Sequence, residues 1–214
     1  MRRLHSTAAL GLVLLLSLVL PAVGQDRVKT RPSDPLPQPD GNPQYFPEGV
    51  FRLDPNLRVD GIARLFASRL RDMDEPSLFA HSGSKEHVYR VVKLSSFWNN
   101  VAVRLVVAPD GTGQLFTKIR DYHEGHAVTA RTQQVDNTDV QKFLTLLESS
   151  RFWEMPSAGP LLDPDATLWA IEGVRDIKYH AVERQELDPT SYTDACKYLV
   201  EDLAKATSKT KRHE

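Results

Sequence analysis

Two runs of alternating apolar and polar residues flank the dipeptide Asp110-Gly111, and they constrain the fold more than any other feature. Asp-Gly between two such runs is typical of a β-hairpin, in which Gly111 supplies the positive φ that the turn requires. If Ala108 faces Thr112, one face of the hairpin is continuously apolar, whereas a slip of one residue would mix the two faces. This register pairs Leu105 with Leu115, Val101 with Ile119 and Arg104 with Phe116.

The segments around this hairpin predict the fold class. Apolar residues at helical spacing predict helices over 60–73, 136–156 and 192–206. "HVYRVVKL" upstream and Val128–Gln133 downstream read as strands, and 168–184 reads as a second hairpin. We expect an α+β domain: an antiparallel sheet of about six strands, a four-stranded meander plus a C-terminal hairpin, packed by about three helices.

The N-terminus predicts a secretory signal peptide over residues 1–24. Arg2-Arg3 form a basic start, Ala8–Leu20 is largely apolar, and small residues precede a cleavage site near Gly24-Gln25. The apolar run is shorter than the about 20 residues that a membrane-spanning helix needs, so an uncleaved anchor is the less favoured alternative. We therefore expect a chain that is exported to the periplasm or beyond, and soluble without a transmembrane segment after cleavage.

The mature chain divides by composition. Residues 25–47 are rich in proline and predict a flexible leader, with a proline-rich ligand for a partner as the alternative interpretation. Residues 48–206 suffice for one α+β domain, and residues 207–214 form a charged tail. Removing Arg2-Arg3 from 27 basic residues leaves 25 against 28 acidic ones, a net charge of −3 without clustering, so nucleic-acid binding is not expected. The only cysteine, Cys196, excludes an intrachain disulfide and lies on an apolar stripe, where an unreactive thiol is expected.

The late hairpin has two possible registers. A three-residue loop with a bulge would pair Val174 with Lys178 and would place Glu172 opposite His180. A two-residue turn would instead set Glu172 against Tyr179. The first register is preferred because it collects four residues on one apolar face: Trp169, Ile171, Tyr179 and Ala181.

If Glu172 lay opposite His180, the two side chains could act as an acid–base pair. The carboxylate would raise the pKa of the imidazole or orient one tautomer for proton transfer. No G-x-S-x-G motif or similar nucleophile accompanies the pair, so a structural cross-strand contact is favoured over catalysis. Trp169, Tyr179 and Trp98 are candidates to line a ligand groove, although aromatic packing between sheet and helices is the favoured interpretation.

The sequence "DYHEGHAV" is a second candidate site. Asp121, His123, Glu124 and His126 cluster between two predicted strands, and imidazoles with a carboxylate suit Zn²⁺ or Cu²⁺. The spacing lacks the helical H-E-x-x-H arrangement of zinc proteases. A solvated turn is therefore favoured, and no metal or cofactor is predicted.

Four stretches resemble an uncharacterised family of bacterial exported proteins. They are "EPSL" at 75–78, "VAVRLVVAPDGTG" from 101, "FLTLLESSRFWEMP" from 143 and "LWAIEGVRDIKYHAVER" from 168. The family has a W-x-x-E-G element before a hairpin and a Y-H pair, and the likeness covers roughly residues 60 to 203. The resemblance implies a domain outline without an activity, substrate or cofactor. Family members tend to have glycine where Ile177 stands, and a tryptophan-serine-proline where this chain has Gln185 to Pro189.

These observations favour a non-catalytic function. We expect an exported binding or cell-envelope accessory domain, whose partner would be a protein or a component of the envelope. The alternative is an exported hydrolase or metal-dependent enzyme that uses Glu172 and His180, or the turn from His123 to His126.

Overall fold

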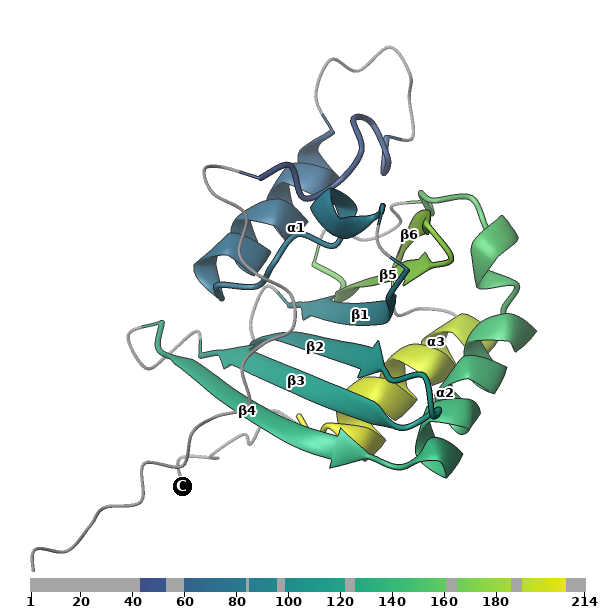
Figure 1. Cartoon of the computed structure of the whole chain (residues 1–214). Coiled ribbons are helices and arrows are strands. Elements are labelled where there is room, and N and C mark those ends of the chain that lie inside the picture. The colour runs from purple at the N-terminus through teal and green to yellow at the C-terminus, as the bar shows by residue number, and fades with distance from the viewer. Residues whose placement is uncertain are drawn as a thin grey trace, which may run out of the picture. The chain divides into compact units, whose positions relative to one another are not determined.

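The computed structural model describes residues 43–52, 60–83, 85–95, 99–121, 126–160, 165–185 and 190–206, all within a unit spanning 32–214. These residues form a six-stranded sheet in the order β4-β3-β2-β1-β5-β6, and every neighbouring pair is antiparallel (Figure 1). The strands are β1 (His87–Leu94), β2 (Asn100–Val107), β3 (Gly113–Arg120), β4 (Val128–Val135), β5 (Leu168–Arg175) and β6 (Lys178–Gln185). The predicted α+β class, a meander followed by a hairpin, is confirmed.

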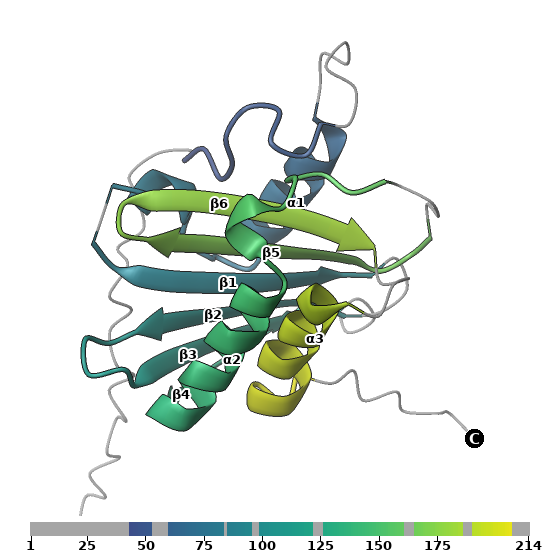
Figure 2. The same ribbon diagram turned by 90° about the vertical axis from the view of Figure 1, so that its right-hand side faces the viewer.

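Helices pack on both faces of the sheet. α2 (Asn137–Ser149) and α3 (Ser191–Lys197) lie side by side on one face, and α1 (Gly61–Asp72) lies on the other (Figure 2). A π-helical segment, Tyr198–Leu203, continues α3. Two short 3₁₀ helices complete the described part: η1 (Phe79–His81) and η2 (Phe152–Glu154). No helix among the described residues is both long enough and apolar enough to cross a membrane.

The packed domain extends into residues 43–47, which the sequence analysis assigns to the leader. Tyr45 and Phe46 are buried against the α1 side of the sheet. The Phe46 ring lies 5.2 Å from that of Phe51 and 6.4 Å from that of Phe66, measured between centroids. Two aromatic side chains bury enough apolar surface to hold this segment despite its prolines.

The central hairpin has the predicted register. Leu105 pairs with Leu115, and Arg104 pairs with Phe116. The N–H of Ala108 donates to the carbonyl oxygen of Thr112 at 2.8 Å, which closes the loop at the predicted position. Gly111 has a φ of 85°, as the turn requires.

The late hairpin has neither of the predicted registers. Its turn consists of Asp176 and Ile177, so Glu172 pairs with Ala181 and Gly173 pairs with His180. Asp176 and Ile177 have φ values of 50° and 64°, the left-handed conformation that both central residues of a type I′ turn adopt. The twist of a type I′ turn matches the twist of the strands, and this match outweighs the strain at a β-branched residue.

Replacing Ile177 by glycine is expected to raise the free energy of unfolding by about 1 kcal/mol, because glycine adopts positive φ without a steric penalty. The Ile177 side chain is 65% exposed, so little packing is lost. Ile177→Val keeps the β-branch and serves as the control, with no gain expected. Urea unfolding of the three proteins tests this; a less stable glycine variant would contradict the strain at this turn.

Candidate functional site

Glu172 lies in β5 directly opposite Arg90 of β1, and both side chains are fully buried. Nε of Arg90 donates to Oε2 of Glu172 at 2.8 Å, and Nη2 of Arg90 donates to the same oxygen. The other carboxylate oxygen, Oε1, accepts a hydrogen bond of 3.0 Å from the hydroxyl of Tyr179. Both oxygens of Glu172 are therefore bound by other side chains of the domain.

A second buried carboxylate, that of Glu75, extends this contact into a network. Its Oε2 accepts a hydrogen bond of 3.0 Å from Nε of Arg104 and lies 3.5 Å from Nη1 of Arg90. Its Oε1 lies 3.4 Å from Nζ of Lys118, at the rim of the site. We call the four fully buried residues the buried ion network: Glu75, Arg90, Arg104 and Glu172.

The charges of this network compensate one another. Burial lowers the pKa of Arg90, but the carboxylates of Glu172 and Glu75 raise it more, so the guanidinium keeps its charge. Burial raises the pKa of Glu172, and the contacts with Arg90 and Tyr179 offset this only in part. Burial and the nearby Glu172 also raise the pKa of Tyr179, so its hydroxyl retains the proton that it donates. The arrangement holds the charges in place and presents no free base.

The network also fastens the sequence EPSL, which follows α1, to the sheet. Nη1 of Arg90 donates to the carbonyl oxygen of Pro76 at 2.5 Å. The hydroxyl of Ser77 donates to the carbonyl oxygen of Gln44 at 2.7 Å, and Leu78 is fully buried. Every position of EPSL thus has a role in packing the α1 side of the domain.

His180 lies on the opposite face of the sheet from Glu172, because it pairs with Gly173 rather than with Glu172. Its Nε2–H donates to the carbonyl oxygen of Met155 at 3.1 Å, and its ring lies 5.0 Å from that of Phe152. Burial lowers the pKa of His180, which favours the neutral imidazole. The structure therefore does not bring the proposed acid–base pair together.

Gly173 explains why glycine follows Glu172 in the W-x-x-E-G element. A Cβ atom at this position would lie 3.0 Å from Cε1 of Phe152 and 3.1 Å from Cη2 of Trp153. Only glycine lets these two rings of η2 pack so closely on β5. The adjacent Glu172 and Gly173 therefore secure the two opposite faces of the sheet.

The three aromatic candidates do not form one groove. Trp169 is buried on the α2 side, where Nζ of Lys93 lies 4.7 Å from the centre of its ring. Tyr179 is half-buried on the other face, and its ring lies 5.3 Å from that of Phe79. The prediction that Trp169 and Tyr179 share a face is wrong, because the turn is one residue shorter than the preferred loop. Trp98 lies outside the described residues.

The metal hypothesis concerns the turn between β3 and β4. The N–H of Asp121 donates to the carbonyl oxygen of Ala127 at 3.0 Å, and His126 is exposed with a φ of 64°. His123 and Glu124 lie outside the described residues. Within the described ranges, no group of three or more His, Cys, Asp and Glu side chains is placed to hold a metal ion. The turn therefore stays a prediction.

Glu75, Arg90 and Arg104 are residues of the candidate site that no sequence motif marks as a group. A signal was present, since Arg90 and Arg104 each interrupt an otherwise apolar stretch of β1 or β2. An arginine on the buried face of a strand requires a buried carboxylate nearby. Which carboxylate it meets depends on the order of the strands, and no local pattern reveals that order.

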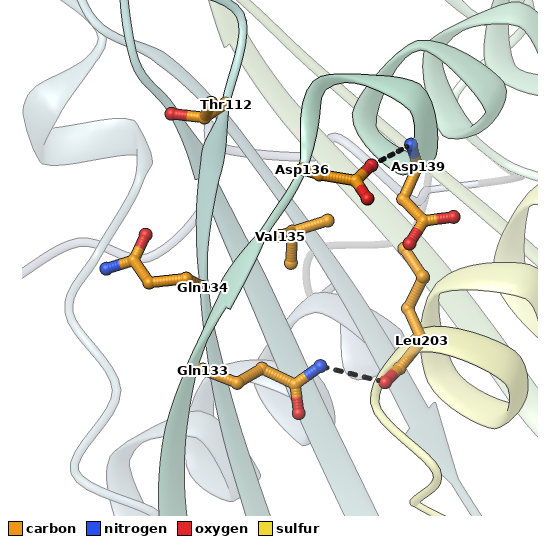
Figure 3. A pocket seen from close by; sticks show the side chains of 7 residues that line it. All are labelled: Thr112, Gln133, Gln134, Val135, Asp136, Asp139 and Leu203. Carbon is orange, nitrogen blue, oxygen red and sulfur yellow. Dashed lines mark hydrogen bonds between the residues drawn. The ribbon is translucent and has the colours of Figure 1, made fainter.

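Three hollows in the described surface offer room for a ligand, with volumes of about 440, 410 and 490 Å³. Neither Glu172 nor His180 lines any of them. The first lies where β4 leads into α2 (Figure 3). There Oδ1 of Asp136 accepts a hydrogen bond of 2.9 Å from the N–H of Asp139, and Nε2 of Gln133 donates to the carbonyl oxygen of Leu203 at 2.9 Å. Its polar side chains are therefore largely engaged.

The second hollow is similar. Its arginine, Arg184, donates through Nη1 to the carbonyl oxygen of Glu183 at 2.6 Å and through Nη2 to that of Pro156 at 2.8 Å. The hydroxyl of Tyr192 donates to the carbonyl oxygen of Val182 at 2.7 Å. These groups hold β6 in place, so the arginine and the tyrosine of this hollow are bonded within the framework.

The third hollow differs from the other two in its number of arginines and in how few contacts their side chains make. It lies between residues 43–52 and α1, and we call it the arginine groove because three arginines line it: Arg52, Arg64 and Arg71. In the described part of the chain, the guanidinium of Arg64 has no hydrogen-bond or ion-pair partner, although the backbone N–H of this residue is bonded. The guanidinium of Arg71 lies 5.6 Å from the centre of the Tyr45 ring, which forms part of the wall.

No family model matches the chain, and no curated protein is similar enough to it to show a relationship. Conclusions about function therefore depend on the geometry of these sites. Among these three hollows, the arginine groove is lined by three arginines, the second by one and the first by none.

Proposed function

We propose that the protein is an exported bacterial binding or cell-envelope accessory domain without catalytic activity, and that its arginine groove binds an anionic ligand. One observation carries the proposal: Glu172 and His180 are engaged within the framework, whereas in the described structure the Arg64 side chain of the groove has no partner and Nε of Arg52 has no hydrogen bond. A carboxylate or phosphate group matches the planar fork of donors that a guanidinium presents.

The arginines of the groove are weakly compensated. Among the described residues, Arg52 forms an ion pair with Glu48 alone, at 4.0 Å, and the Glu48 side chain is 91% exposed. An exposed ion pair at this distance contributes little and is easily replaced by a ligand. Nε of Arg52 is buried without a hydrogen-bond partner in the described structure, so an incoming oxygen would satisfy it.

Asp60, the other acidic residue of the groove, is occupied by the backbone. Its Oδ1 accepts a hydrogen bond of 2.9 Å from the N–H of Ala63, and its Oδ2 accepts one of 2.7 Å from the N–H of Phe51. This carboxylate caps the N-terminus of α1 and compensates the positive end of that helix. Three arginines and two carboxylates line the groove, so its described lining has a net charge of +1.

A titration with two soluble polyanions tests the groove: polygalacturonate, which carries carboxylates, and polyphosphate. We expect binding of at least one polymer, with an affinity that falls as salt rises. The variant Arg52→Gln/Arg64→Gln/Arg71→Gln is expected to weaken this binding by tenfold or more, about 1.4 kcal/mol.

The matched control removes the same charge elsewhere on the surface, through Lys85→Gln, Arg151→Gln and Lys178→Gln. These three side chains are exposed and do not line the groove. Equal weakening in both triple variants would show that net charge alone attracts the polymer. That result, or no binding of either polymer, would reject the groove as the site.

Export is tested separately. The basic start and apolar run of residues 1–24 support a cleaved signal peptide. We expect the chain expressed in a bacterium to appear in the periplasmic fraction or the medium with Gln25 as its first residue. N-terminal sequencing of the recovered protein measures this, and an unprocessed chain in the cytoplasm would contradict it.

A further inference from the structure

The two edge strands of the sheet, β6 and β4, differ in whether another described segment covers them. At the β6 edge, the N–H of Glu183 donates to the carbonyl oxygen of Ser157 at 2.8 Å, so the segment before β5 covers that edge. At the other edge lies β4 (Figure 1). Five of its eight residues are exposed. Within the described part of the chain, no backbone hydrogen bond reaches the outer side of β4.

The register of β4 shows which backbone groups are unpaired. The hydrogen bond between Asp121 and Ala127 continues the β3–β4 ladder, in which bonded and non-bonded pairs alternate. Counting from Ala127, the backbone groups that point away from β3 belong to four residues: Val128, Ala130, Thr132 and Gln134. These N–H and C=O groups form a continuous row along the edge.

β4 has few of the features by which proteins protect an exposed edge. It contains no proline and no lysine, and it pairs with β3 over eight consecutive residues without a bulge. Its only charged side chain is that of Arg131. Such a strand is suited to accept another strand.

We propose that β4 pairs in antiparallel fashion with β4 of a second copy of this chain, so that one sheet runs through both copies. A two-fold axis perpendicular to the sheet keeps each face continuous, and it can pass through Thr132. Thr132 then pairs with Thr132 of the other copy, and Ala130 pairs with Gln134. Thr132, Ala130 and Gln134 all have outward-pointing backbone groups, so this register pairs those groups on both strands, and Val128 lies opposite Asp136, beyond the end of β4.

Charge selects this register over its neighbour. A two-fold axis through Arg131 would place two guanidinium groups opposite each other, which is unfavourable. The axis through Thr132 instead pairs Arg131 with Gln133 and places two threonines face to face, a favourable cross-strand pair. An edge contact of this kind buries little surface compared with a permanent dimer, so the dimer is expected to depend on concentration.

Sedimentation velocity of the purified full chain over a range of concentrations tests the dimer. We expect a monomer–dimer equilibrium in the wild-type protein and a monomer in Thr132→Lys and in Thr132→Glu, where like charges meet on the axis. Mixing these two variants is expected to restore the dimer, because opposite charges then face each other. Thr145→Lys, an exposed change on α2, is the matched control and is expected to dimerise normally.

A cysteine crosslink tests the register. In Thr132→Cys the two Cα atoms lie about 5.5 Å apart in a hydrogen-bonded pair, within the range that a disulfide spans. Arg131→Cys places the cysteines diagonally across the axis, so a much lower yield of crosslinked dimer is expected. The native Cys196 is buried and does not compete. A wild-type chain that stays monomeric, a Thr132→Lys dimer, or crosslinking at Arg131 in preference to Thr132 would each overturn the proposal.

Discussion

Glu172→Gln is expected to lower the free energy of unfolding by about 3–5 kcal/mol, because it removes one charge of a buried pair and leaves the other. Glutamine keeps the volume of the side chain, so the effect reports the lost charge and not a cavity. Arg90 remains fully buried, and its Nη1 remains 3.5 Å from Glu75, which is also bound to Arg104. Urea unfolding followed by tryptophan fluorescence measures the loss.

A matched ion pair on the surface provides the control. Glu148 and Arg175 approach to 2.6 Å, but their side chains are 55% and 37% exposed. Glu148→Gln makes the same chemical change and is expected to cost less than about 1 kcal/mol, since water compensates both charges. Comparing the two variants separates the effect of burial on stability from the effect of ion pairing alone.

A double-mutant cycle keeps the test informative if Glu172→Gln folds poorly. Arg90→Met removes the opposite charge, and the double variant Arg90→Met/Glu172→Gln removes both. We expect the double variant to lose less stability than the sum of the single variants, with a coupling energy on the order of 2 kcal/mol. A Glu172→Gln protein of unchanged stability that has lost an activity or a ligand would contradict the structural role and revive the catalytic hypothesis.

The central hairpin was predictable because its two faces differ. The face with Leu105 and Leu115 is apolar except at Thr117, so a slip of one residue would bury several polar groups. Asp110-Gly111 also fixes the length of the loop. Local sequence therefore contains all the information that this register requires.

The late hairpin was not predictable in the same way, because both of its faces are buried. Glu172 reads as a surface residue until its partner is known, and that partner, Arg90, is 82 residues away in the chain. The preferred register treated Tyr179 as part of the apolar face, whereas its hydroxyl binds Glu172. Long-range ion pairing thus decided which face each residue occupies, and the period-two pattern does not reveal such pairing.

Glu183→Gln is expected to stabilise the protein at pH 8 by about 3 kcal/mol and to have little effect at pH 4. Glu183 is 1% exposed, and its Oε1 has no hydrogen-bond partner in the described structure. Burial raises the pKa of Glu183 to about 7, against the opposing effects of the Gly159 backbone and Arg184. Glutamine resembles the protonated carboxyl group, which is the form that this site favours.

The direction of the pH dependence follows from proton binding. The pKa of this carboxyl group rises from 4.5 to about 7 on folding, so between these values the folded chain binds more protons than the unfolded chain. The contribution of Glu183 to the stability of the wild-type protein is therefore fully present in acid. It is lost as pH rises from about 4.5 to 7, and it changes little above pH 7. Glutamine does not ionise, so the Glu183→Gln variant does not lose this stability. The difference in the free energy of unfolding between variant and wild type should therefore grow as pH rises over the same range.

Denaturant unfolding at pH 4, 6 and 8 measures this difference, with Glu154→Gln as the control for the change in net charge. The Glu154 side chain is 63% exposed, and its substitution is expected to shift stability by less than about 0.5 kcal/mol at each pH. If Glu183→Gln instead destabilised the protein at pH 8, the carboxylate would have to be held by a favourable contact. Glu183 would then be ionised and compensated on the α1 side of the sheet. The buried ion network on the same side is compensated in this way, because each of its charges has an opposite charge beside it.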